Sequence, residues 1–105
     1  MQELNDLTGL ERAELRSALC DYVKQIICGE RQDAYGSPEQ NFETISKFWS
    51  LYLGCSITPV QVSNMMVLFK VARGMNNIAV VDNFLDAAGY SIIAASLEVK
   101  RNDPS

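Results

Sequence analysis

Two short segments of the chain share a hydroxyl residue, a proline directly after it, and a glutamine three residues after the hydroxyl. They are Ser37-Pro38-Glu39-Gln40 and Thr58-Pro59-Val60-Gln61. This pattern is typical of helix starts, because the hydroxyl caps a backbone N–H, proline suits the first helical position and glutamine can close a capping box. Thr8-Gly9-Leu10-Glu11 has the spacing of a capping box without the proline. These three starts predict an all-α chain.

Apolar residues recur at helical spacing after each start. We expect helices over residues 10–28, 37–54 and 58–74, and a fourth from about Val81 or Asp82 to about Lys100. The four main helices are expected to form a compact bundle. At 105 residues the chain fits a single helical domain over 1–105, with residues 1–8 and 101–105 frayed.

The third and fourth predicted helices are apolar on nearly all sides. A helix of this kind must be covered all round, and a four-helix monomer has little material for that. We therefore expect a homodimer that packs these two helices across a two-fold axis. The alternative is a tight monomer with the third helix at its centre.

Composition excludes several classes of function. The sequence has no histidine, so Ser-His and Cys-His catalysis and His-ligated zinc are ruled out. A formal net charge of −4 argues against general nucleic-acid binding. No apolar run is long enough for a transmembrane helix, and the acidic N-terminus is unlike a secretory signal. Three cysteines without C-x-x-C spacing are expected to be reduced thiols in the cytoplasm.

Two acids stand out in the fourth predicted helix. Asp82 and Asp86 lie four residues apart on one helix face, where like charges repel. A Mg²⁺ ion would relieve the repulsion and give a site for a phosphate substrate. In the alternative interpretation, Asp82 caps the helix and Asp86 pairs with a buried lysine. The candidate is Lys70, which interrupts the apolar run MMVLFKVARG.

Lys70 could instead bind a phosphate, together with Arg73 one turn later. A further candidate binding region is the stretch ERQDAYGSPEQNF between the first two helices. It supplies a cation, a phenol and an amide in Arg31, Tyr35 and Asn41. Loops on a rigid scaffold often hold such groups, so these three residues are predicted to contact a polar ligand.

A set of motifs resembles a family of short, uncharacterised phage and prophage proteins. The motifs are R-x-x-x-Y-G, N-F, W-x-x-Y-L-G, K-x-x-R and D-x-x-x-D-x-x-G-Y, which extend over residues 31–90. The resemblance covers about residues 30–98. It implies a phage or prophage origin, and hence the host cell cytoplasm as the compartment.

More distantly, the predicted bundle is similar to the all-α nucleoside triphosphate pyrophosphohydrolases of the MazG type. Those enzymes hold Mg²⁺ with an E-x-x-E pair on one helix and an E-x-x-D pair on another. Asp86 matches the last acid, whereas Asn83 occupies the position three residues before it. Glu39 and Glu43 are four residues apart rather than three.

The resemblance implies a nucleotide-handling protein, either a magnesium-dependent pyrophosphohydrolase or a non-catalytic nucleotide binder. In the catalytic version Glu43, Asp82 and Asp86 hold Mg²⁺ while Lys70 and Arg73 neutralise the triphosphate. The alternative belongs to another class: a small acidic interaction protein that blocks a host factor without catalysis. The partners expected are therefore a second copy, a nucleotide or a host protein.

Overall fold

The computed structural model describes residues 7–29 and 36–99, and all its secondary structure there is helical. The four helices are α2 (Arg12–Cys28), α4 (Pro38–Leu53), α5 (Pro59–Gly74) and α6 (Val80–Glu98). The predicted all-α class with four helices is confirmed. The chain ends that were predicted to be frayed lie mostly outside the described residues. None of the helices in the described residues is long and apolar enough to cross a membrane.

Two of the predicted helix starts are confirmed in atomic detail. The N–H of Gln40 donates to Ser37 Oγ at 3.1 Å, and Pro38 is the first residue of α4. At α5 the capping box is complete: the N–H of Gln61 donates to Thr58 Oγ1, and the N–H of Thr58 donates to Gln61 Oε1. These caps form because each needs only residues three apart in the chain.

The predicted start of the first helix is wrong. Thr8 lies in a turn in which the N–H of Leu10 donates to the carbonyl of Leu7, so the capping geometry does not form there. Helix α2 begins at Arg12 instead, after Glu11, whose side chain makes no capping bond. The alternative that Asp82 caps the last helix is also wrong, because α6 begins at Val80 after Ala79, which has a left-handed backbone with φ of 48°.

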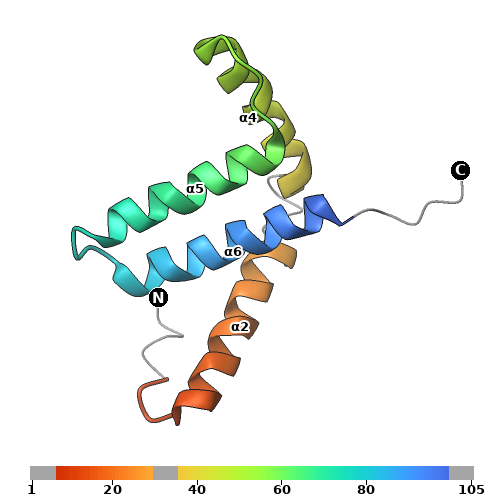
Figure 1. Cartoon of the computed structure of the whole chain (residues 1–105). Coiled ribbons are helices and arrows are strands. Elements are labelled where there is room, and N and C mark those ends of the chain that lie inside the picture. Colours follow the sequence, from red (N-terminus) through yellow and green to blue (C-terminus); the bar gives the residue numbers. More distant parts are fainter. Residues whose placement is uncertain (1–6, 30–35, 100–105) are drawn as a thin grey trace, which may run out of the picture.

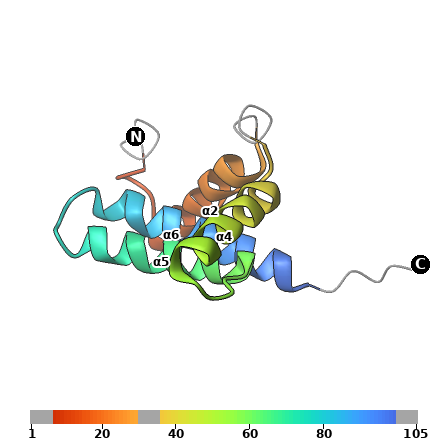
Figure 2. The ribbon, with the colours of Figure 1, turned by 90° about the horizontal axis from the view of Figure 1, so that it is seen from above.

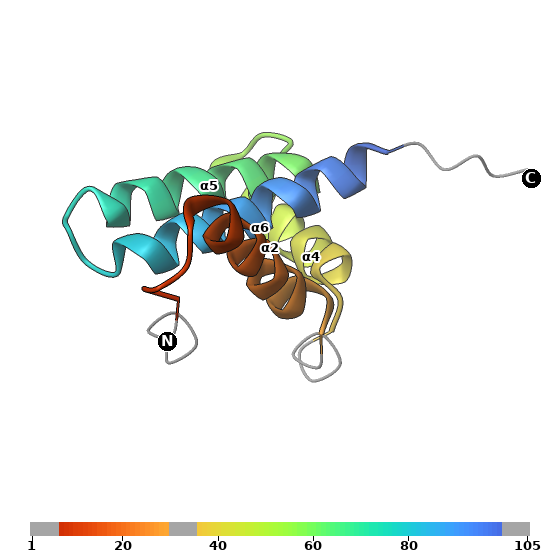
Figure 3. The same cartoon turned by 90° about the horizontal axis from the view of Figure 1, so that it is seen from below.

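Helices α5 and α6 lie antiparallel, side by side, and form the centre of the molecule (Figure 1). Helix α2 packs on α6 and α4 mainly on α5, and both cross the same face of this hairpin (Figures 2 and 3). Their free ends point away from it in opposite directions (Figure 1). The arrangement is more open than the predicted compact bundle: its radius of gyration is 15.8 Å, against about 13 Å for a compact domain of this length.

The core lies where α4 crosses the hairpin. Buried Phe42, Val62 and Ile93 form its centre, one from each of α4, α5 and α6. Fully buried Ser63 links the two hairpin helices, because its hydroxyl donates to the carbonyl of Tyr90 at 2.7 Å. On the other side Gly89 lets α2 come close to α6: a Cβ at this position would lie 3.1 Å from a methyl carbon of Ile27.

Candidate functional site

A pocket opens where α2, the start of α4 and the hairpin meet, and we call it the central pocket. Its volume is about 380 Å³, which falls in the ~300–1,000 Å³ range of small-molecule sites. All four helices contribute to its wall. The lining residues are Ile26, Ile27, Gly36, Pro38, Asn41, Phe42, Lys70, Asp86, Gly89, Tyr90 and Ile93.

An ion pair forms one part of the pocket wall. Lys70 Nζ of α5 lies 3.1 Å from Asp86 Oδ2 of α6, and the two side chains are 17% and 38% exposed. The alternative interpretation from the sequence, in which Asp86 pairs with a largely buried Lys70, is confirmed. Neighbouring positive and negative groups give the wall a hydrogen-bond donor and an acceptor side by side.

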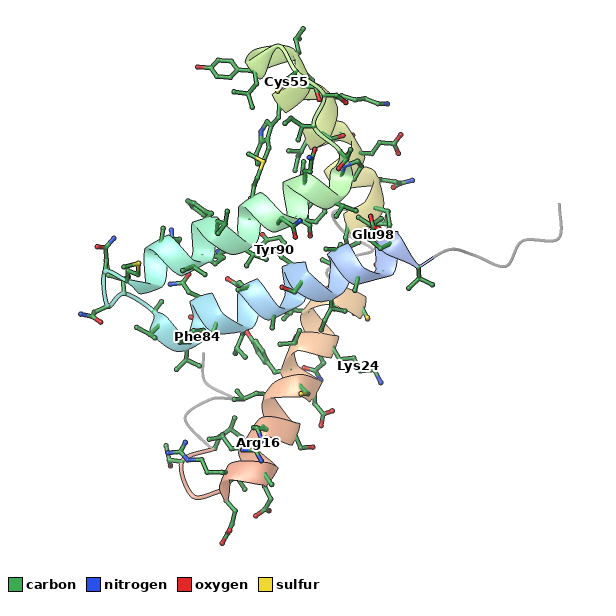
Figure 4. All side chains as sticks on the ribbon, viewed as in Figure 1. Arg16, Lys24, Cys55, Phe84, Tyr90 and Glu98 are labelled. Atoms are coloured by element: carbon green, nitrogen blue, oxygen red, sulfur yellow. The ribbon has the colours of Figure 1, made fainter. Side chains whose placement is uncertain are left out.

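Aromatic and aliphatic side chains form the rest of the wall. The rings of Phe42 and Tyr90 lie with their centroids 5.8 Å apart and are tilted by 30°. Tyr90 lies midway along α6 (Figure 4). Gly89 lines the pocket without a side chain, and Ile27 of α2 approaches it closely there. The pocket wall therefore exposes polar and apolar atoms in about equal measure.

Three of the predicted site residues meet in this pocket, namely Asn41, Lys70 and Asp86. They come from three different helices. Arg31 and Tyr35 lie outside the described residues.

Arg73 is not among the residues that line the central pocket. Its Nε donates to Asn83 Oδ1 at 3.4 Å, and its guanidinium lies 5.7 Å from the centre of the Phe69 ring. Arg73 therefore stabilises the end of the hairpin, and a ligand shared by Lys70 and Arg73 stays a prediction.

The acids predicted to bind a metal do not gather. Glu43 is exposed on α4, where it pairs with Lys47 at 3.7 Å. Asp82 is half-buried, and its Oδ1 has no hydrogen-bond partner among the described residues. Within residues 7–29 and 36–99, no three acidic or cysteine side chains form a group that could hold a metal ion. The magnesium site stays a prediction that the geometry of one chain does not support.

Asn83 has a structural role. It is 4% exposed, and its Nδ2 donates to the carbonyl of Ile78 at 2.8 Å while its Oδ1 accepts from Arg73. The turn before α6 holds Asn77 and Ala79 with positive φ angles. An amide is required here because a carboxylate could not donate to the carbonyl. This accounts for an asparagine where the MazG-type pattern has an acid.

Sequence reasoning did not select Gly89 or Tyr90 as site residues. A signal for them exists: Asp86, Gly89, Tyr90 and Ile93 follow the spacing i, i+3, i+4 and i+7, which places them on one face of α6. All four line the central pocket.

Comparisons with known proteins place these residues in a wider context. The profile of a domain of unknown function, DUF6378, matches residues 18–98. The Gene 55 protein of Mycobacterium phage D29 is 35% identical over 77 residues, which are 73% of this chain and 51% of that protein. The Gene 55 protein of Mycobacterium phage L5 is 35% identical over 82 residues, 77% of this chain and 53% of that protein. The chain spans about half the length of these curated relatives, and no solved structure matches it.

Proposed function

This chain belongs to the DUF6378 family, which has relatives among mycobacteriophage proteins, and on that premise we propose that it binds a nucleotide in the central pocket. The observation that carries the proposal is the meeting of Asn41, Lys70 and Asp86 beside an aromatic wall. Each of the three is a polar group of the kind that fixes the orientation of a ligand, while the aromatic and aliphatic part of the wall supplies apolar contact.

The ion pair favours the base of the nucleotide over its phosphates. Lys70 Nζ lies only 3.1 Å from Asp86 Oδ2, so a phosphate bound to this lysine would lie beside a carboxylate and the two anions would repel. A nucleobase edge instead offers an acceptor and a donor next to each other, which match the ammonium and the carboxylate. The ring of Tyr90, which is only partly buried and lies against Phe42, supplies apolar and stacking contact for the base.

The catalytic form of this proposal is a MazG-like, magnesium-dependent pyrophosphohydrolase. It requires Glu43, Asp82 and Asp86 to share a metal ion, but these residues do not form such a group within one chain. We therefore propose the non-catalytic form, a nucleotide binder, in which Asp86 contacts the ligand directly.

The same proposal includes a homodimer through α5 and α6, in the cytoplasm of the host cell. Several large apolar side chains of the hairpin support the dimer because they are exposed in the single chain, among them Leu68, Met75 and Phe84. Burial of such side chains between two copies would be favourable.

Calorimetric titration of the full chain with nucleoside mono- and triphosphates, with and without Mg²⁺, tests the proposal. We expect saturable binding that does not require magnesium. The Asp86→Asn variant should weaken it by about tenfold or more, since a hydrogen bond to a charged group contributes ~1.5–3 kcal/mol. Glu43→Gln is the matched control, because Glu43 also forms an ion pair but lies on the exposed surface of α4.

Two outcomes would contradict the binding proposal. Binding or turnover that requires magnesium and is lost in Glu43→Gln would favour the hydrolase. An absence of heat with every nucleotide, together with saturable binding to a host protein, would favour the alternative of an acidic interaction protein.

A further inference from the structure

The outer face of α4 carries apolar side chains that nothing in the described chain covers. Phe48, Leu51 and Tyr52 follow the spacing i, i+3 and i+4, so they form one stripe. They are 67%, 79% and 89% exposed. The adjoining face of α4, with Phe42, Ile45 and Trp49, already packs against the core. Helix α4 is thus apolar on two faces, and only one of them is used within the chain.

A second cavity lies between α5 and α6, close to the turn that joins them, and we call it the hairpin pocket. It is lined mainly by carbon atoms of Val71, Met75, Val80, Phe84 and Ala87. Its volume of about 180 Å³ is below the ~300 Å³ lower end of small-molecule sites. A pocket of this size and lining fits one or two apolar side chains rather than a metabolite.

The stripe and the hairpin pocket cannot meet within one chain. The free end of α4 points away from the hairpin (Figure 1), and Phe84 lies on the part of α6 near the turn, beyond the crossing of α2 (Figures 1 and 4). The chain therefore presents a protruding apolar surface and a separate apolar recess, both without a partner in the described residues.

We propose that the α4 stripe of one copy docks into the hairpin pocket of a second copy, and that the exchange is reciprocal about a two-fold axis. This inference rests on the homodimer proposed above and adds α4 to its interface. A two-fold interface uses the same two surfaces on both copies, so it covers the stripe and the pocket of each chain at once. A foreign partner on either surface would leave the other one exposed.

The exposed apolar area of the two surfaces approaches what a stable dimer needs. Phe48, Tyr52 and Phe84 are between 67% and 89% exposed, and a full aromatic side chain buries ~150–250 Å². These three side chains alone therefore offer on the order of 450 Å². The exposed Leu51, Val71 and Met75 of the same two surfaces add to this, and a specific interface needs roughly 800 Å² from each partner.

Sedimentation of the full chain tests the docking. The wild-type chain should sediment at twice the chain mass at micromolar concentration. Tyr52→Glu on the stripe and Phe84→Lys at the pocket should each weaken the dimer by at least tenfold. The double variant should recover part of the loss, because the carboxylate introduced on the stripe of each copy would then face the ammonium introduced at the pocket of the other. Val99→Lys is the control, since Val99 is 69% exposed but belongs to neither surface.

The outcomes distinguish three claims: the docking of the α4 stripe into the hairpin pocket, the homodimer through α5 and α6, and nucleotide binding. A dimer that is lost in Phe84→Lys but unchanged in Tyr52→Glu would overturn the pairing and leave a homodimer through α5 and α6. A monomeric wild-type chain would overturn both, whatever the nucleotide titration gives. All variants change exposed side chains, and circular dichroism checks that each keeps its helical content.

Discussion

At the residue scale, the contact that matters most is the ion pair between Lys70 and Asp86. It joins the two hairpin helices at 3.1 Å and lies in the wall of the central pocket. The sequence could show that each residue was unusual in its apolar helix. It could not show that they meet, because the meeting depends on how α5 and α6 are aligned after their turn. Because of the same alignment, Lys70 forms its ion pair with Asp86 and not with Asp82, which lies one helical turn earlier.

The first prediction concerns the stability that this pair provides. Asp86→Asn removes the counter-charge of an ammonium that is only 17% exposed. We expect a loss of about 2 kcal/mol in the free energy of unfolding, between the values for surface and buried pairs. Urea denaturation measures it, and Glu43→Gln should change stability by less than about 0.5 kcal/mol. An unchanged stability in Asp86→Asn would mean that the pair has no structural role.

A second prediction concerns Asn83. Asn83→Asp should cost about 2 kcal/mol, because a buried carboxylate cannot donate to the carbonyl of Ile78 and repels it, although Arg73 offsets part of the loss. Thermal unfolding measures this, with the exposed Asn76→Asp in the same turn as the control. If Asn83→Asp were instead tolerated and gained a rise in Tm with Mg²⁺, the position would be a metal ligand after all.

At the scale of elements, local chemistry determined which predictions were correct. The caps at Ser37 and Thr58 were predictable because all their bonds lie within one helical turn. The start of α6 was expected at about Val81 or Asp82, close to the observed Val80, but its cap was not predictable, since the helix follows Ala79, which has no capping side chain. Its turn is held by Asn83 from inside the helix, and that bond to Ile78 has no recognised sequence pattern.

The third prediction compares two threonines with the same expected role. Thr58→Ala should destabilise the chain by about 1 kcal/mol, because it removes the capping box of α5. Thr8→Ala should change stability by less than about 0.5 kcal/mol, since α2 begins beyond it. Chemical denaturation of both variants measures the difference. Equal losses would show that Thr8 caps α2 in solution.

At the scale of the whole molecule, the open arrangement is the feature that sequence patterns did not predict. The sequences of α5 and α6 are apolar on nearly all sides, which indicated that something must cover the hairpin. They did not indicate that α2 and α4 would both cross the same face of it (Figures 2 and 3). That crossing creates the central pocket on one side and leaves apolar side chains such as Phe84 exposed. The proposed binding site and the proposed dimer interface are thus two consequences of one arrangement.

The central claim is that the central pocket binds a nucleotide through its base. Amide NMR spectra of the labelled full chain, recorded during titration with a nucleoside monophosphate in the absence of metal, test it most directly. Saturable shifts should appear at Gly36, Asn41, Gly89 and Tyr90, which line the pocket, and should need a much higher nucleotide concentration in Asp86→Asn. Shifts confined to residues outside the pocket, or no shifts at millimolar nucleotide, would contradict the claim.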